Sequence, residues 1–349
     1  MKVDRNLVDI KIITDVRIYQ CPVWSQTTDL TEDLYAWFVK FIGKSPDEMP
    51  IILKQLLDMS LIIRNLFRYD VIITGNIKTA QITAFFRWIF KRRSAKQIIL
   101  ELMLDEPRNS IRWKIKRWLQ MHLFKGVDLI FVSARSEIDT YATRFTIPHT
   151  KFRFLPFHTD IVNPAVVNTH DGYVLSAGKT GRDYQALMDA VEGLDVKVII
   201  VSDDHHAIGL RVPANVQLLV NIPYDEYLEL LRNCWFVVVP LRKVVKSTGQ
   251  VVILEAMGLG KPVIATETTG TTDYIETGVN GILVPLENPT ALKAAIMNLM
   301  SDVDFYSRLA VAGLDTVKKK HTFDMYVATI LDAARELVTC QPSRRSSSE

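Results

Sequence analysis

Short runs of β-branched and aliphatic residues alternate with helix-forming segments along almost all of the 349 residues. The runs are apolar at consecutive positions, as in Val196–Val201 and Val263–Ala265. Strands that are apolar on both faces belong to parallel sheets whose crossover helices cover both sides. The alternation therefore predicts an α/β protein made of doubly wound, Rossmann-like layers.

The expected strands fall into two groups along the chain. Those of the first half are Ile10–Asp15, Asp70–Thr74, Lys96–Leu102, Asp128–Ser133 and Phe152–Phe157. Those of the second half are Tyr173–Ser176, Val196–Val201, Val216–Val220, Phe236–Val239, Val263–Ala265 and Ile282–Val284. The expected helices are Pro50–Phe67, Ala80–Phe90, Ser110–Phe124, Glu137–Phe145, Tyr184–Val191, Tyr224–Arg232, Gln250–Met257 and Thr290–Met300.

A polar stretch over Thr159–Gly172 separates the two groups of strands. We therefore expect a first domain over 1–160 and a second over 161–320, each large enough for its own core. The tail 341–349 is rich in Ser and Arg, and we expect it to be disordered. Two Rossmann-like domains predict an active site in the cleft between them.

Composition limits the cellular setting. No run of 18 or more apolar residues is present, and the first nine residues carry Lys2, Asp4, Arg5 and Asp9, which argues against a secretory signal. The cysteines Cys21, Cys234 and Cys340 are widely spaced and lack metal-ligand spacing. Scattered cysteines of this kind are typical of reduced thiols in a cytosol, so we expect a cytoplasmic protein.

The net charge of +3 is unevenly distributed, because the window Arg87–Lys125 holds 11 bases and 3 acids together with three tryptophans. Within its expected helix, one face carries Ile111, Ile115, Trp118 and Leu119. Two interpretations are open: a helix that rests on an anionic membrane surface, or a core helix with a solvated basic face. No nucleic-acid reader motif accompanies the charge, so we do not expect a nucleic-acid partner.

The stretch after the strand Phe236–Val239 carries the strongest chemical signal. A loop with Arg242, Lys243 and Lys246 leads into Ser247-Thr248-Gly249-Gln250, which opens a helix containing Glu255. A glycine at a helix start lets an anion approach the free backbone amides, where the helix dipole favours negative charge. The bases suit a diphosphate and Glu255 suits ribose hydroxyls, although an ordinary Rossmann helix with a surface Glu would look similar.

The run from Gly249 to Leu292 resembles the donor-site region of glycosyltransferase family 4. The matching positions are Glu255, Ala256, Met257, Gly260, Pro262, Val263, Ile264, Thr266, Gly270, Asn280 and Gly281. The resemblance implies two Rossmann-like domains of the GT-B type, with a C-terminal helix over 321–340 that crosses back to the first domain. It also implies transfer of a sugar from a nucleoside diphosphate sugar with retention of anomeric configuration.

One position departs from the family. The motif has a first Glu eight residues before the second, and Ser247 stands there in this chain. The resemblance therefore carries the ribose role to Glu255, whereas Ser247, Thr248, Gly249 and Gln250 must replace the carboxylate that contacts the donor sugar. Either the donor is read differently or activity is reduced or lost.

A second donor-binding loop is expected at Gly178-Lys179-Thr180-Gly181-Arg182. GKTG suggests a phosphate-binding P-loop, but the required earlier glycine is absent, because Tyr173 stands at that position. In the family, a strand is followed by Gly and two bases that neutralise the donor diphosphate. By resemblance, Lys179 and Arg182 take this role and stabilise the leaving group, with two solvated bases in a turn as the alternative.

Signals in the first half are fewer. Asp105 and Glu106 follow an expected strand as candidate catalytic carboxylates, although an acidic turn before Pro107 that caps a helix explains them equally well. Gly75 and Asn76 follow another strand and are candidates for acceptor binding.

The resemblance to family 4 implies a retaining glycosyltransferase that needs neither metal nor other cofactor. Its partners would be a sugar nucleotide, a glycan or lipid-linked acceptor, and an anionic membrane surface at the inner face of the membrane. The alternative is a catalytically silent sugar-nucleotide-binding or partner subunit, suggested by Ser247.

Overall fold

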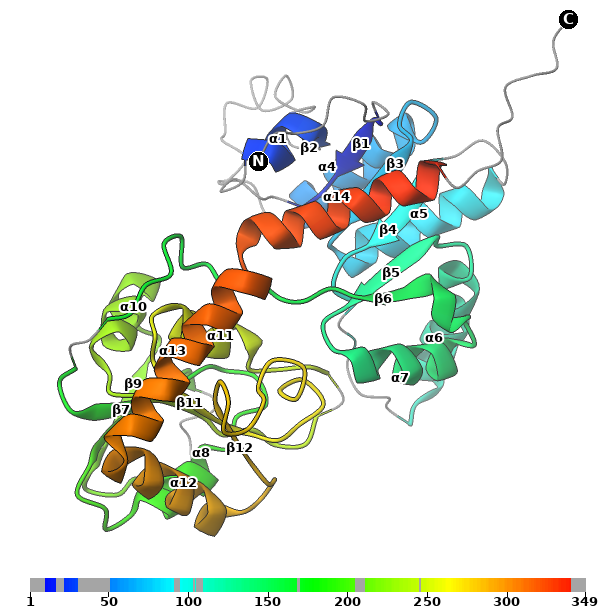
Figure 1. The fold of residues 1–349 in the computed structure, drawn as a ribbon. Helices are drawn as coiled ribbons and strands as arrows, with labels where there is room; N and C mark the ends of the chain where they lie inside the picture. The colour runs from blue at the N-terminus through cyan, green and yellow to red at the C-terminus, as the bar shows by residue number, and fades with distance from the viewer. Residues whose placement is uncertain are drawn as a thin grey trace, which may run out of the picture. The chain divides into compact units, whose positions relative to one another are not determined.

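The computed structural model describes residues 10–16, 22–30, 51–90, 95–102, 104, 109–167, 170–204, 211–244 and 246–339. The chain divides into two compact units (Figure 1). Unit 1 comprises Met1–Leu155 and Val327–Glu349, and unit 2 comprises Pro156–Tyr326. Within these described ranges each unit contains one six-stranded parallel sheet, so the expected pair of doubly wound α/β layers is confirmed.

The sheet of unit 1 has the strand order β2-β1-β3-β4-β5-β6. Its strands are β1 (Ile12–Thr14), β2 (Thr28–Leu30), β3 (Val71–Thr74), β4 (Lys96–Ile99), β5 (Leu129–Val132) and β6 (Phe152–Phe154). Its helices are α1 (Pro22–Thr27), α4 (Ile51–Asn65), α5 (Ile77–Ile89), α6 (Ile111–Phe124) and α7 (Arg135–Phe145), and a 3₁₀ turn, η2 (His149–Lys151), precedes β6.

Strand order reverses beside β1 in unit 1. The chain passes from β1 to the neighbouring β2, then returns to the other side of β1 as β3 and continues outward to β6. Right-handed crossovers place α5, α6 and α7 on one face of β3–β6, where α6 contacts both α5 and α7. The reversal makes the carboxyl ends of β1 and β3 the ligand-binding position of this sheet.

The sheet of unit 2 has the order β12-β11-β10-β7-β8-β9. Its strands are β7 (Tyr173–Ala177), β8 (Lys197–Ser202), β9 (Val216–Val220), β10 (Val237–Val239), β11 (Val263–Thr266) and β12 (Ile282–Val284). Its helices are α8 (Tyr184–Val191), α10 (Tyr224–Asn233), α11 (Gln250–Gly258), α12 (Pro289–Ser301) and α13 (Val303–Lys320). Strand order reverses here between β7 and β10.

Helix α11 is the most buried helix of unit 2, with all of its residues except Val251 buried. It packs against α13, where Gly313 allows close approach, since a Cβ at that position would lie 3.1 Å from Met257 Cγ. Tight packing on both sides fixes α11 and the side chains at its start.

Some features were not expected from the sequence. Neither α13 nor the pair α1 and β2 was predicted, and the unit boundary follows Leu155 rather than residue 160. Helix α14 (Phe323–Thr339) belongs to unit 2 through Tyr326 and to unit 1 from Val327 onward. The tail 341–349 lies outside the described residues.

Candidate functional site

The carboxyl ends of β7 and β10 carry two loops that bind to each other. The amide of Arg242 donates to the Gly181 carbonyl at 2.8 Å, and the amide of Asp183 donates to the Pro240 carbonyl at 3.0 Å. Because the strand order reverses between these strands, the loops lie where open α/β sheets bind ligands. Both expected donor loops therefore occupy one place in unit 2.

A cavity of about 290 Å³ opens beside these loops. Its lining residues come from the carboxyl ends of β7, β8 and β9 and from α10 and α11. They are Ala177, Gly178, Lys179, Val201, Ser202, Asn221, Ile222, Tyr224, Tyr227, Val251, Val252 and Glu255. Three of the predicted donor residues, Gly178, Lys179 and Glu255, thus line a single cavity.

Glu255 is the buried carboxylate of this cavity, with 1% of its surface exposed. Its Oε1 accepts a hydrogen bond from the Tyr224 hydroxyl at 2.6 Å, and its Oε2 accepts one from the Tyr227 hydroxyl at 2.7 Å. A carboxylate has about four acceptor positions, so each oxygen retains capacity for a further donor. The two tyrosines therefore orient Glu255 while leaving room for a ligand hydroxyl.

Burial raises the pKa of Glu255, and the hydrogen bonds from Tyr224 and Tyr227 oppose this rise. The nearby charge of Asp160 raises the pKa further. The tyrosines thus favour the ionised form in a setting that otherwise disfavours it. In its ionised form Glu255 only accepts hydrogen bonds, so it favours ligands that donate them.

The loop after β7 holds one buried and one exposed base. Arg182 is 6% exposed, and its Nε and Nη1 donate to the carbonyls of Ala177 and Thr180 at 2.8 and 2.9 Å. Burial lowers the pKa of its guanidinium, while the phenolic oxygen of Tyr184 opposes the change. Lys179 is exposed and lines the cavity. The structure thus places Arg182 beneath the loop and Lys179 at the cavity.

Gly178 permits this arrangement. Its φ is +123°, and a Cβ would lie 2.6 Å from Arg182 Cζ. Only glycine leaves room for the guanidinium and adopts this backbone conformation without strain. The glycine is therefore required by the buried base.

The start of α11 presents polar groups that the protein leaves unsatisfied. Gly249 caps the helix with φ +97° and ψ −17°, and the first-turn amides follow it. Among the described residues, the buried Thr248 Oγ1 and Gln250 Nε2 have no hydrogen-bond partner. Ser247, where the family has its first Glu, is 5% exposed. Unsatisfied buried groups at a helix start mark a place for an anionic or hydroxyl-rich ligand.

A second polar cluster lies at the reversal point of unit 1. The Gly75 amide donates to Asp15 Oδ1 at 2.7 Å, while Asn76 caps α5 by accepting from the Lys78 amide at 2.9 Å. Gly75 and Asn76 line a cavity of about 340 Å³ with Ile77 and residues 99–102. The candidates Asp105 and Glu106 lie outside the described residues.

Asp15 was not predicted. Burial raises its pKa to about 6, against the lowering effect of the Gly75 amide. Its Oδ2 is buried and finds no hydrogen-bond partner among the described residues. The sequence signal was an acid directly after the buried run Ile12–Thr14.

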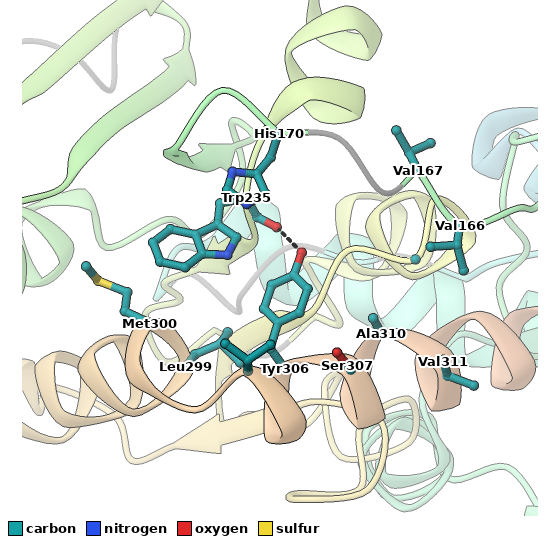
Figure 2. A pocket seen from close by; sticks show the side chains of 12 residues that line it. Val166, Val167, His170, Trp235, Leu299, Met300, Tyr306, Ser307, Ala310 and Val311 are labelled. Carbon is teal, nitrogen blue, oxygen red and sulfur yellow. Dashed lines mark hydrogen bonds between the residues drawn. The ribbon is translucent and has the colours of Figure 1, made fainter.

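The larger cavity of unit 2, about 580 Å³, lies at the opposite ends of the strands (Figure 2). His170 and Trp235 precede β7 and β10, and their rings stack with centroids 5.2 Å apart. The Tyr306 hydroxyl donates to the Trp235 carbonyl at 2.7 Å, as the dashed line in Figure 2 marks. Ligands of open α/β sheets bind at the carboxyl ends, so the smaller cavity is the functional candidate.

Among the described residues there is neither a metal-binding cluster nor a membrane-spanning helix. No group of three or more His, Cys, Asp or Glu side chains in the described ranges is placed to hold a metal ion. Within the same ranges, none of the helices has the length and apolar character to cross a membrane.

Known proteins resemble both the second unit and the whole fold. Residues 179–302 match the family model described as glycosyl transferases group 1. An uncharacterized glycosyltransferase of Methanocaldococcus jannaschii is 30% identical over 139 residues, which are 38% of this chain and 39% of that protein. The matched segment thus spans about two fifths of this relative.

Residues 179–302 are thus similar in sequence to the group 1 glycosyltransferases. Solved structures extend the likeness to the fold of the whole chain. HepE of Anabaena, in complex with UDP, has a TM-score of 0.65 at 15% identity and covers 93% of this chain and 99% of its own. A glycosyltransferase from Rickettsia africae has a TM-score of 0.66 at 13% identity and covers 95% and 99%. The chain therefore has the GT-B fold.

The matched segment 179–302 contains every predicted donor residue except Gly178, which directly precedes it. It also contains Tyr224 and Tyr227, which sequence reasoning missed. The sequence feature that could have identified these residues is a pair of tyrosines three residues apart, at the start of a helix that follows the end of a strand.

Proposed function

We propose that this protein transfers a sugar from a nucleoside diphosphate sugar to an acceptor. The observation that carries the proposal is the cavity at the strand reversal of unit 2. There Glu255, held by two tyrosines, lines the same cavity as Gly178 and Lys179, and the unsatisfied Thr248 and Gln250 stand at the start of the helix that carries Glu255. A carboxylate for ribose hydroxyls beside cations and free amides for a diphosphate matches the two halves of a sugar nucleotide.

Each predicted residue takes a specific role in this proposal. Glu255 accepts hydrogen bonds from the ribose, and Lys179 with the first-turn amides of α11 contacts the diphosphate. Arg182, buried under Gly178, adds positive potential without leaving its carbonyl partners. As the glycosidic bond breaks, negative charge grows on the departing diphosphate, and fixed positive groups stabilise that charge.

Ser247, Thr248 and Gln250 bind the donor sugar in place of a carboxylate. The unsatisfied Thr248 Oγ1 and Gln250 Nε2 supply one hydroxyl and one amide donor for sugar hydroxyls. A Cβ on Gly270 would lie 2.7 Å from Gln250 Nε2, so the loop at Gly270 closes tightly over these groups. We place the chain in family 4, with transfer of a hexose, retention at the anomeric carbon and no metal or other cofactor.

The acceptor side of the proposal rests on unit 1. A glycan or lipid-linked acceptor would bind by the cavity at Gly75 and Asn76, near the buried carboxylate of Asp15. This role fits polysaccharide biosynthesis at the cytoplasmic face of a membrane. Asp105 and Glu106 remain candidates for orienting the acceptor.

Calorimetry with a panel of nucleoside diphosphates tests the donor assignment, followed by transfer assays with the matching sugar nucleotides. UDP is the first nucleotide to test, because HepE of Anabaena has been crystallised with UDP and with UDP-glucose. We expect one nucleotide to bind in the micromolar range or tighter, with sugar release in the presence of acceptor. Absence of binding to every nucleotide would contradict the proposal.

Ser247 favours a second candidate, a silent sugar-nucleotide-binding subunit. Tight nucleotide binding without sugar release, either to water or to any acceptor extract, would support that candidate over the transferase.

A further inference from the structure

Helix α6 buries one side and exposes an apolar stripe on the other. Its buried residues are Gln120, Leu123 and Phe124. Its exposed apolar residues are Ile111, Ile115, Trp118 and Leu119, at 71, 60, 58 and 44% exposure. Their spacing of four, three and one residues places them on one face, about half a turn away from the buried side. This outer stripe (Ile111, Ile115, Trp118, Leu119) is not part of the core.

Helix α5 has a matching stripe. Phe85, Trp88 and Ile89 are 41, 59 and 49% exposed, and their spacing puts them opposite the buried side of α5. Helices α5 and α6 contact each other and cover the same face of the sheet. Both stripes therefore point away from the sheet, and together they make an apolar surface of aromatic and aliphatic side chains.

Positive charge borders the outer stripe on both sides. Helix α6 contains Arg112, Lys114, Lys116 and Arg117 and no acid. At about 100° per residue, Arg112 and Lys114 fall roughly 80° to either side of the stripe. In the part of the chain that the structure describes, neither Arg112 nor Lys114 forms an ion pair. The arrangement is an apolar stripe between two rows of long basic side chains.

We propose that the outer stripe and the stripe of α5 dock unit 1 onto an anionic membrane surface. The apolar side chains would enter the boundary between headgroups and acyl chains, while Arg112 and Lys114 extend to lipid phosphates. Helix α6 has 14 residues, fewer than the roughly 20 needed to cross a bilayer, so it would lie along the surface. This inference does not depend on the donor site.

A second copy of the chain suits this surface less well. Dimers with twofold symmetry pair the same patch on both subunits. Stripe against stripe would bring the Arg112 and Lys114 rows of two copies together, and no acid on α6 would offset the repulsion. An anionic surface instead neutralises both rows at once.

Co-sedimentation with vesicles of phosphatidylcholine alone, and of phosphatidylcholine with 30% phosphatidylglycerol, tests the proposal. We expect binding to the anionic vesicles only, reduced at least tenfold by Trp118→Glu and by Ile115→Glu. The matched control is Val303→Glu, at a valine of α13 that is 74% exposed, and it should bind like the parent. For the charge, Arg112→Glu with Lys114→Glu should abolish binding, and Lys197→Glu in unit 2 should leave it unchanged.

All variants change exposed residues, so folding is checked by their unfolding midpoints, which should match that of the parent. Equal binding to both vesicle types, or full binding by the Trp118→Glu variant, would overturn the proposal. Sedimentation velocity tests whether a second copy of the chain covers the outer stripe. If the parent forms a dimer that Trp118→Glu converts to a monomer, and the parent does not bind vesicles, the outer stripe would be assigned to self-association instead.

Discussion

Glu255 gives the sharpest test at the scale of single residues. Replacing it by Ala removes the acceptor for ribose hydroxyls and leaves the Tyr224 and Tyr227 hydroxyls without their partner. We expect the affinity for the best nucleoside diphosphate to fall by about 1.5–3 kcal/mol, the range for a hydrogen bond to a charged group. Titration calorimetry measures the loss of affinity, and Glu229→Ala, at an exposed position, is the control. An unchanged Kd would exclude the ribose role.

The raised pKa of Asp15 leads us to expect a pH-dependent contribution to the free energy of unfolding. Its pKa is about 6 in the folded state, above the usual 3.9 of an unfolded chain. A raised carboxyl pKa means that ionisation opposes folding, so the penalty is absent below about pH 4 and complete above about pH 6. We therefore expect Asp15→Asn to raise the free energy of unfolding by about 2–3 kcal/mol at pH 7 relative to its effect at pH 4.

Denaturant unfolding at several pH values checks the Asp15 prediction. Asp195→Asn, at an exposed loop position of unit 2, is the control for the substitution itself. A constant difference between Asp15→Asn and the parent from pH 4 to 7 would refute the burial argument. A carboxylate that lowers stability in this way is expected where function requires it.

At the scale of a structural element, the role of the loop after β7 can be tested by substituting its glycine. Gly178 and Gly193 both have positive φ, +123° and +75°, but only Gly178 faces a side chain that a Cβ would strike, since nothing lies within 4 Å of a Cβ on Gly193. Both Ala variants should lose about 1 kcal/mol from backbone strain. Only Gly178→Ala should also displace the Arg182 guanidinium and weaken nucleotide binding, by tenfold or more.

Nucleotide titrations of the two Ala variants separate strain from the clash. If Gly193→Ala weakened binding as much as Gly178→Ala, general destabilisation would explain both effects, and the role of Arg182 would be withdrawn. A nucleotide affinity of Gly178→Ala equal to that of the parent would have the same consequence.

Elements differ in how far the sequence predicts them. The strands were predicted because fully buried strands are continuous apolar runs, and all the expected ones are present. Helix α13 was missed because its buried face includes Ala310 and Gly313, small residues that weaken a helical pattern but allow contact with α11. Helix α6 was predicted, but periodicity alone did not reveal which of its two apolar sides faces the core.

The candidate site was predicted in part for a related reason. Motif positions such as Glu255 and Gly178 follow strand ends and carry a local signal. The roles of Tyr224 and Asp15 depend on residues far away in the chain. Tyr224 forms a hydrogen bond with Glu255, which lies 31 positions later, and Asp15 forms one with Gly75, which lies 60 positions later. Asn280, by contrast, belongs to the sequence motif but stabilises a local turn. Its side chain accepts a hydrogen bond from the Glu276 amide and donates one to the Tyr274 carbonyl.

The whole molecule consists of two units with separate cores. In unit 2 the apolar core gathers residues such as Val174, Phe236 and Ile264, and in unit 1 separate clusters form around Phe124 and around Ile62. The sequence predicted this division, because the strand–helix alternation pauses at a polar stretch and then resumes. Each unit has the size at which a domain can unfold as one cooperative step.

Calorimetric unfolding should therefore show two transitions, and a nucleoside diphosphate should move one of them. At 100 times the Kd, binding to the folded state adds about 2.7 kcal/mol, which raises the Tm of a unit of this size by roughly 5–10 °C. The shifted transition should be that of unit 2, and Glu255→Ala should reduce the shift at the same nucleotide concentration. Asp15→Asn, which acts in unit 1, should move only the other transition. A single transition, or equal shifts of both with nucleotide, would show that the two units unfold together.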